Sequence, residues 1–413
     1  MRLATHRSPG LQLSEHAFEV PLDHARPEEE KLTIFAREVA AASRSKDELP
    51  WLVFFQGGPG HEATRPMGRT DPTWLGRALD DFRVLLLDQR GTGRSCPIGE
   101  LRDLGPGAQA DYLKHFRADA IVRDAELIRS ELGVERWTVL GQSFGGFCVT
   151  SYLSFAPEGL EAAILTGGLP PLDRQPDDVY RATYQRVLDK NRAYYDRYTH
   201  DRDRVLAIIE RLEAEDVRLP SGDRLTPRRF RQLGALLGSG AGFERLHYLL
   251  ELPFGSPAFL HDIEMAYPFA RNPIYAVLHE ACYAPDCATK WSAERVMPDE
   301  FRRDQTLFTG EHVYPWMLED YGALHPLADA ARTLADHQWP QLYKPEVLRG
   351  NEVPAVAAIY TDDMYVERSF SEETAATIRG LRPWITNEYE HDALRADGAR
   401  VLGRLLDMLR GRV

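Results

Sequence analysis

The amino-acid sequence predicts an α/β fold in which a mostly parallel β-sheet is flanked by helices. Four short apolar runs, residues 51–55, 84–88, 137–140 and 162–168, have the continuous hydrophobicity of strands that are covered on both faces. Helix-like segments alternate with the strand-like runs, and strands that alternate with helices pair in parallel. Glycine-rich turns follow these runs, so we expect the ligand-binding loops at the carboxyl edge of the sheet.

The chain is expected to contain two structural units. Its 413 residues exceed what one hydrophobic core usually holds. Strand-like runs disappear after residue 170, and amphipathic helical patterns continue to residue 350, where strand-like runs return. We therefore predict a large helical cap domain, residues 171–350, inserted into a core made of residues 1–170 and 351–413.

Further elements complete the predicted core. Residues 16–41 read as two strands joined by a charged turn, and residues 117–132 read as a helix that ends at a glycine. After the cap, residues 354–363 and 383–392 return to the strand pattern, and residues 398–411 form a terminal helix. In the cap, a capping residue precedes a proline three times, which predicts helix starts at Thr226, Ser256 and Asn272.

Composition argues against nucleic acid and membranes as partners. The net charge is −13, no run reaches the length of a membrane span, and the N-terminus lacks the apolar core of a signal peptide. The four cysteines are scattered, with no second pair to complete a zinc site. We expect reduced thiols, no metal, no cofactor and a cytoplasmic location. The cysteines are Cys96, Cys148, Cys282 and Cys287.

The strongest chemical signal is the segment 137–147, WTVLGQSFGGF. A short apolar strand leads directly into Gly-x-Ser-x-Gly, and a helix-compatible run follows. Strand, Gly-x-Ser-x-Gly and helix together are the layout of a nucleophile elbow, in which small residues let the serine oxygen project from a tight turn. The pattern alone is weak, but this context predicts that Ser143 is a nucleophile.

A nucleophilic serine needs a histidine base and a carboxylate that orients it. In α/β-hydrolases these follow the serine in the order acid, then histidine. His391 is the only histidine in the C-terminal strand-like segment, just past its final strand, and it is the predicted base. Asp362 and Asp363 follow the preceding strand; their side chains point in opposite directions, so at most one reaches the histidine. Asp363 is favoured, with Asp362 as the alternative.

An oxyanion hole needs backbone N–H donors that face the developing charge. The amide of Phe144, directly after the nucleophile, is one expected donor. The second is expected from Gly57 or Gly58, in the glycine-rich loop after the strand 51–55. Phosphate-binding glycine motifs and His-Glu-x-x-His are both missing, so neither a nucleotide nor a metal is required.

Taken together, these motifs resemble the prolyl aminopeptidase (proline iminopeptidase) family of α/β-hydrolases. Residues 56–60, QGGPG, resemble that family's HGGPG loop, with Gln56 where many members have histidine. Residues 88–95, DQRGTGRS, and residues 141–146, GQSFGG, match two further family segments. The long cap resembles the larger subgroup of the family. The departure at Gln56 leaves the loop intact, because backbone amides do its work.

This resemblance implies an α/β-hydrolase fold and removal of an N-terminal proline from small peptides, with cap carboxylates that bind the free imino group. Glu280 matches the family's Glu-x-x-Tyr motif and is the first candidate. The second carboxylate is open among three residues in plausible cap segments: Glu244, Glu251 and Glu311. Phe147 and Tyr152, in the helix after the elbow, either line an apolar pocket for the proline ring or pack in the core.

Two other functions stay open from the sequence. An esterase, a lactonase or a broader aminopeptidase would share the same fold and nucleophile. A non-catalytic receptor for a small ligand is the alternative from another class, although serine, acid and histidine are all present in order. Oligomeric state and peptide length are not indicated by any pattern.

Overall fold

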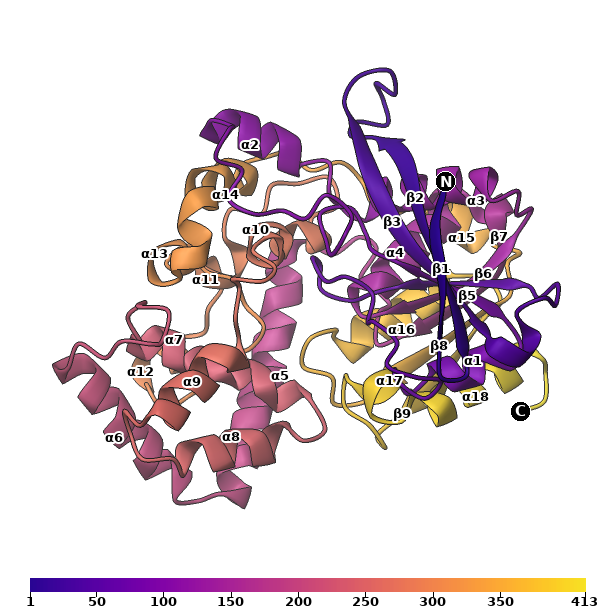
Figure 1. Cartoon of the computed structure of the whole chain (residues 1–413). Coiled ribbons are helices and arrows are strands. Elements are labelled where there is room, and N and C mark those ends of the chain that lie inside the picture. Colours follow the sequence, from indigo (N-terminus) through magenta and orange to yellow (C-terminus); the bar gives the residue numbers. More distant parts are fainter.

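The computed structural model describes all 413 residues, which form a central sheet and a large group of inserted helices (Figure 1). The sheet has nine strands in the order β1-β2-β3-β5-β4-β6-β7-β8-β9. The strands are β1 (Arg2–Ser8), β2 (Leu11–Pro21), β3 (Lys31–Ala41), β4 (Trp51–Phe55), β5 (Arg83–Leu87), β6 (Trp137–Gln142), β7 (Leu160–Thr166), β8 (Ala355–Tyr360) and β9 (Leu381–Thr386).

The six strands from β4 to β9 pair in parallel, and the first three strands extend the sheet in antiparallel fashion. The parallel strands place their carboxyl ends at one edge, as the sequence predicts. Strand β1 is not in the prediction, because nearly all its residues are exposed and carry no alternating apolar pattern. Strands β8 and β9 are shorter than predicted and end at Tyr360 and Thr386, so the residues that follow form loops at this edge.

Helices cover both faces of the sheet, and the side chains of each strand alternate between two apolar clusters. Leu52 and Phe54 of β4 belong to the cluster under α1 and α18, whereas Val53 and Phe55 belong to the cluster that includes α3 and α4. All four are at most 3% exposed. The helices around the sheet are α1 (Leu75–Leu79), α3 (Ala118–Glu131), α4 (Phe144–Phe155), α15 (Pro345–Arg349), α16 (Arg368–Thr377), α17 (Ala393–Ala396) and α18 (Gly398–Leu409). Helix α2 (Pro106–Leu113) instead lies beside α14 (Ala328–Ala335) of the inserted helices (Figure 1).

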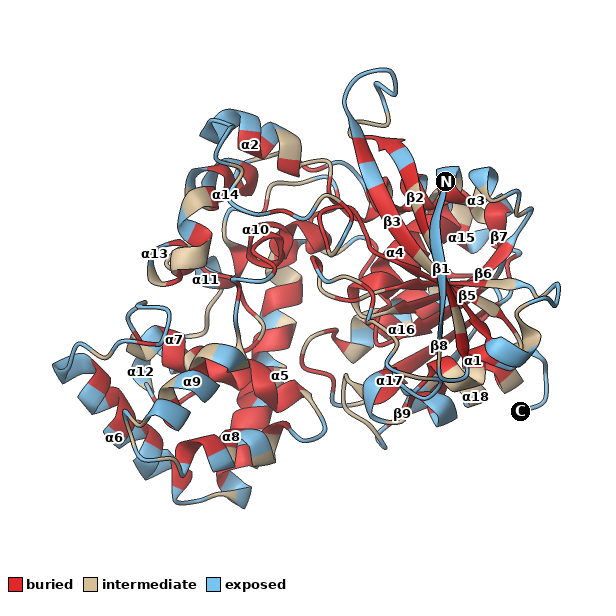
Figure 2. Cartoon of the chain, viewed as in Figure 1, coloured by how far each residue is buried: buried red, intermediate tan, exposed pale blue.

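The inserted helices occupy the chain between β7 and β8 and lie to one side of the sheet (Figure 1). Helix α5 is largely buried, whereas the outward sides of α6, α8 and α9 are exposed (Figure 2). They are α5 (Pro176–Arg197), α6 (Asp201–Ala214), α7 (Pro227–Arg231), α8 (Gly242–Leu250), α9 (Pro257–Ala266), α10 (Ile274–Leu278), α11 (Ser292–Arg295), α12 (Asp299–Arg303), α13 (Met317–Asp320) and α14 (Ala328–Ala335). Short 3-10 turns are η1 (Ala42–Arg44), η2 (Pro157–Gly159), η3 (Gln232–Gly238), η4 (Glu280–Tyr283) and η5 (Gly322–Leu327).

Two of the three predicted helix caps are confirmed. The side chains of Thr226 and Ser256 accept hydrogen bonds from the backbone N–H groups of Arg229 and Phe259, at the starts of α7 and α9. Asn272 does not cap α10; its side-chain amide instead contacts His61 in the loop after β4. This third residue therefore joins the inserted helices to the core.

No helix of this chain is long and apolar enough to span a bilayer. All four cysteines are free thiols, as expected from their scattered positions.

Candidate active site

Ser143 lies on a strained turn between β6 and α4. Its φ and ψ are 55° and −125°, a conformation that a non-glycine residue rarely adopts. The turn is closed by glycines: a Cβ on Gly145 would clash with the carbonyl oxygen of Phe55, and one on Gly146 would clash with that of Gly168. Backbone segments thus approach closely on both sides, and the serine side chain is displayed at the carboxyl edge of the sheet.

His391 and Asp363 meet at the same edge. His391 Nδ1 lies 2.6 Å from Asp363 Oδ2, and the other oxygen of Asp363 accepts backbone N–H bonds from Tyr365 (2.8 Å) and Val366 (3.0 Å). Burial by itself lowers the pKa of His391, but the charge and hydrogen bond of Asp363 outweigh burial, so the pKa lies above its ordinary value. Asp362 is exposed and has no contact with the imidazole.

The end of β7 brings the histidine next to the serine backbone. A Cβ on Gly167 would lie 3.2 Å from His391 Nδ1, and one on Gly168 would clash with the carbonyl oxygen of Ser143. Sequence reasoning did not include these two glycines in the site. The sequence feature that could have identified them is the pair of glycines directly after a buried strand, next to the elbow in the predicted sheet.

The three predicted oxyanion donors differ in what their N–H groups contact. The N–H of Gly57 donates to the side-chain oxygen of Gln56 at 3.0 Å, so it is already occupied. The N–H groups of Gly58 and Phe144 have no protein acceptor, which leaves them available for a substrate oxygen. Gly57 serves differently: a Cβ there would lie 3.1 Å from Ser143 Cβ, so its small size keeps the serine accessible.

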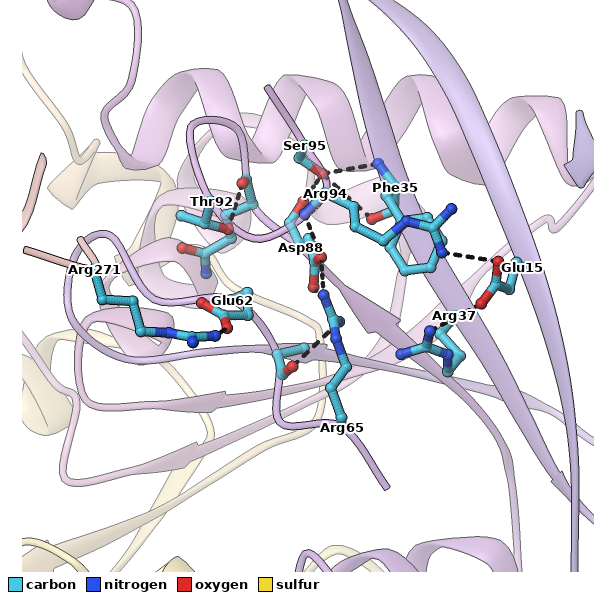
Figure 3. A network of polar contacts seen from close by, with 12 residues as sticks. Glu15, Phe35, Arg37, Glu62, Arg65, Asp88, Thr92, Arg94, Ser95 and Arg271 are labelled. Carbon is cyan, nitrogen blue, oxygen red and sulfur yellow. Dashed lines mark hydrogen bonds and ion pairs between the residues drawn. The ribbon is translucent and has the colours of Figure 1, made fainter. Parts of the chain in front are cut away.

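Two residues of the DQRG segment after β5 hold the glycine-rich loop and the residues that follow it; Figure 3 shows the contacts of Asp88. Gln89 donates its side-chain amide to the carbonyl oxygen of Gln56 at 3.0 Å. Asp88 accepts two hydrogen bonds from Arg65, 2.7 and 2.5 Å long, and a third from the backbone N–H of Arg94 at 2.9 Å. Because Asp88 is fully buried, this paired arrangement fixes the loop that carries Gly58.

Among the four cap carboxylates predicted as amine ligands, only Glu311 is near enough to His391 for its charge to act on the imidazole. It accepts a hydrogen bond from Tyr275 Oη, and its other oxygen is 3.7 Å from His279 Nε2. Burial raises the pKa of Glu311, but the proximity of His279, the hydrogen bond from Tyr275 and the charge of His391 bring it below its ordinary value. Its side chain is 24% exposed, so this ionised carboxylate is not fully enclosed by protein.

Glu280, the first candidate from the sequence, has a different position. One oxygen accepts the backbone N–H of Ala293 at 2.8 Å, at the start of α11, and the other has no hydrogen-bond partner. Its residue is 6% exposed, and burial raises its pKa to about 7. The preceding residue, His279, contacts Glu311, but Glu280 itself does not.

Glu244 and Glu251 are not brought to the site. Glu244 forms an ion pair with Arg197 at 2.6 Å, and Glu251 lies 3.5 Å from His247. Both belong to the end of the inserted group formed by α8 (Figure 1). They are partly exposed residues of a helix and the turn after it.

Phe147 and Tyr152 lie in different surroundings. The Phe147 ring lies 5.5 Å from that of Tyr283, so this residue is at the junction of α4 and the inserted helices. Tyr152 is fully buried between sheet and helix; its hydroxyl donates to Glu126 and accepts from Trp137 Nε1 at 3.0 Å. The pocket role is therefore overturned for Tyr152, because its polar end is satisfied inside the core.

Comparison with known proteins adds a match to one family model and similarities to three relatives. A family model described as alpha/beta hydrolase fold matches residues 50–206. A proline iminopeptidase of Aeromonas sobria is 49% identical over 97% of both chains, and a proline iminopeptidase of Aspergillus aculeatus is 35% identical over 99% of this chain and 96% of the relative. A tripeptidyl aminopeptidase of Streptomyces lividans is 22% identical over 65% of this chain and 55% of the relative.

Proposed function

This chain belongs to the proline iminopeptidase family of α/β-hydrolases and is a prolyl aminopeptidase, and we propose that it releases N-terminal proline from peptides through a prolyl-enzyme intermediate on Ser143. Family membership and the observed sheet confirm the predicted α/β-hydrolase fold. The observation that carries the mechanistic proposal is the strained elbow serine at the sheet edge that also holds the hydrogen-bonded His391–Asp363 pair, with an ionised Glu311 whose charge acts on His391.

The proposed chemistry has two half-reactions. Ser143 Oγ attacks the prolyl carbonyl while His391 Nε2 takes its proton, since Nδ1 is bound to Asp363. The histidine then passes this proton to the leaving peptide nitrogen, which leaves a prolyl ester on Ser143. Water attacks the ester with the same histidine as base, and free proline departs. The N–H groups of Gly58 and Phe144 bind the oxyanion in both halves, each donor contributing about 3 kcal/mol.

Glu311 accounts for the restriction to a chain terminus. A terminal imino group is a cation with two N–H donors, and a hydrogen bond between charged groups contributes about 1.5–3 kcal/mol. An internal peptide bond lacks this charge and would leave the Glu311 carboxylate without a cationic ligand. The rings of Phe147 and Tyr283 supply apolar walls for the five-membered ring.

The test compares substrates that differ only at the amino terminus. We expect wild-type protein to hydrolyse proline p-nitroanilide and Ser143→Ala to lose at least about 10⁴-fold in kcat. N-acetyl-proline p-nitroanilide, whose imino group is blocked, should react far more slowly than proline p-nitroanilide. Undiminished activity in Ser143→Ala would exclude the mechanism, and equal rates with the acetylated substrate would exclude the amine subsite.

A broader aminopeptidase is the second candidate function, favoured by the likeness to a tripeptidyl aminopeptidase. Alanine p-nitroanilide and a tripeptide p-nitroanilide distinguish the two, because a pocket shaped for one proline ring disfavours both. Covalent labelling of Ser143 by a fluorophosphonate would separate every hydrolase from a non-catalytic receptor.

We further propose that the reaction takes place in the cytoplasm. Four free thiols and no disulfide support a reducing compartment.

A further inference from the structure

A short cap segment, residues 271–275, is attached to the glycine-rich loop that carries Gly58, one of the two proposed oxyanion donors. Arg271 forms an ion pair with Glu62, seen at the left of Figure 3. Asn272 Nδ2 lies 2.6 Å from His61 Nδ1, a hydrogen bond donated by the amide. These two contacts join neighbouring residues of the cap to neighbouring residues of the glycine-rich loop.

The packing of this segment also depends on the loop's glycines. A Cβ on Gly60 would lie 2.7 Å from Ile274 Cγ2 and 3.0 Å from the backbone nitrogen of Tyr275. A Cβ on Gly91, after β5, would lie 2.9 Å from Ile274 Cδ1. The start of α10 therefore rests directly on the backbone of the core, where any other residue would push it away.

The last residue of the segment contacts the proposed amine anchor. Tyr275 Oη donates to Glu311 and accepts a weaker hydrogen bond from Tyr267 Oη at 3.4 Å. The Tyr275 ring is held between His279, 5.2 Å away, and His61, 5.7 Å away, and the residue is 6% exposed. Its hydroxyl thus has one orientation, set by rings from both the cap and the core.

Besides Tyr275, the Glu311 carboxylate has His279 as a neighbour, with Nε2 at 3.7 Å, and its own backbone gives it little support. It lies in an irregular stretch between α12 and α13, where no helix or strand sets the direction of its side chain. A substrate's imino group is one residue from the carbonyl that Ser143 attacks, so the carboxylate must be held at a set distance from the oxyanion donors. The segment 271–275 contacts the glycine-rich loop at one end and Glu311 at the other.

We propose that Tyr275 is a positioning residue that holds Glu311 at a fixed distance from the glycine-rich loop and thereby sets selectivity for substrates with a free amino terminus. This inference rests on the proposed function. It predicts that loss of the Tyr275 hydroxyl weakens catalysis only for substrates that use Glu311, because Ser143, His391 and the oxyanion donors are untouched.

The test measures two substrates with Tyr275→Phe. We expect kcat/KM for proline p-nitroanilide to fall about 10-fold, while hydrolysis of p-nitrophenyl acetate, which has no amine, changes by less than about twofold. A merely structural role would lower both rates together. Equal loss with both substrates, or no loss with either, would overturn the proposal.

Two further variants keep the test decisive. The selectivity ratio is kcat/KM for proline p-nitroanilide divided by kcat/KM for p-nitrophenyl acetate. Asn272→Ala removes the contact between the other end of the segment and His61, and it should lower this ratio by about threefold. Tyr194→Phe is the matched control: Tyr194 Oη also donates to a buried carboxylate, Asp201, at 2.5 Å, but contacts neither the loop nor Glu311, so its ratio should equal that of wild type.

The two proposals fail in different ways. If wild-type protein does not hydrolyse proline p-nitroanilide, the proposed function fails and this inference falls with it. If wild type is active and the ratio is unchanged in Tyr275→Phe and Asn272→Ala, only the role of the segment 271–275 is wrong.

Discussion

Along the edge of the sheet, Ser143, Asp363 and His391 follow the ends of β6, β8 and β9, whereas Glu311 lies in an irregular stretch of the inserted helices. The first group is positioned by backbone hydrogen bonding in the sheet and by glycines that allow close approach. The carboxylate is positioned by side chains of distant residues. The edge of the sheet should therefore tolerate little change, and the inserted helices should tune which substrate is accepted.

The largest expected effect separates the two adjacent aspartates at the sheet edge. Asp363→Asn should lower kcat on proline p-nitroanilide by about 10⁴-fold, because the amide no longer holds the histidine in the correct tautomer or stabilises its charged form. Asp362→Asn is the matched control and should leave kcat within about twofold, since Asp362 is exposed. Reversal of the two results would assign the acid to Asp362.

Backbone approach at the elbow gives the next largest effect. Gly145→Ala should lower the free energy of unfolding by about 3 kcal/mol, because its Cβ would overlap the carbonyl oxygen of Phe55. Gly403→Ala, in the middle of α18, should raise it by about 0.5–1 kcal/mol, since its Cβ meets only Arg77 Nε at 3.8 Å. Urea unfolding measures both, and equal values for the two variants would refute close packing at the elbow.

The smallest expected effects distinguish Glu311 from Glu280. Glu311→Gln should lower kcat/KM for proline p-nitroanilide by about 10- to 100-fold through loss of the charge-assisted bond. Glu280→Gln should leave kcat/KM within a few-fold and act on stability instead. A pKa raised to about 7 means that the stabilisation from the protonated carboxyl is present below pH 4.5 and is lost as pH rises to 7.

The glutamine at position 280 stays neutral and keeps that stabilisation. Relative to wild type, the Glu280→Gln variant should therefore gain stability between pH 4.5 and 7, with a difference of at most about 3 kcal/mol above pH 7. Thermal unfolding at pH 5 and pH 8 measures this gain. A variant that instead loses proline p-nitroanilide activity as Glu311→Gln does would return Glu280 to the amine subsite.

Much of the sheet edge was predictable because its signals are local. A continuous apolar run, a glycine pattern and chain order are enough to indicate Ser143, His391 and the choice between Asp362 and Asp363. Strand β1 and the true ends of β8 and β9 were missed, since exposed strands and strand ends depend on their neighbours and not on their own apolar pattern.

The carboxylate that we propose binds the substrate's imino group could not be chosen from the sequence. Glu244, Glu251, Glu280 and Glu311 all stand in helical or turn segments, and no local pattern states which way a glutamate side chain points. The motif match favoured Glu280, but the structure turns that carboxylate toward the start of α11. The adjacent His279 faces Glu311 instead, and successive residues of a 3-10 turn point in different directions.

The fold class, the inserted helices and the nucleophile elbow could be inferred from the amino-acid sequence, because each of these is a short-range pattern of apolar residues, glycines and prolines. Tertiary structure alone decided which aspartate meets His391, which amides are free for an oxyanion and which carboxylate faces the site. It also decided that Asn272 binds His61 and that Tyr275 binds Glu311. These outcomes depend on contacts between residues far apart in the chain, whose distances are set only when the inserted helices pack on the sheet.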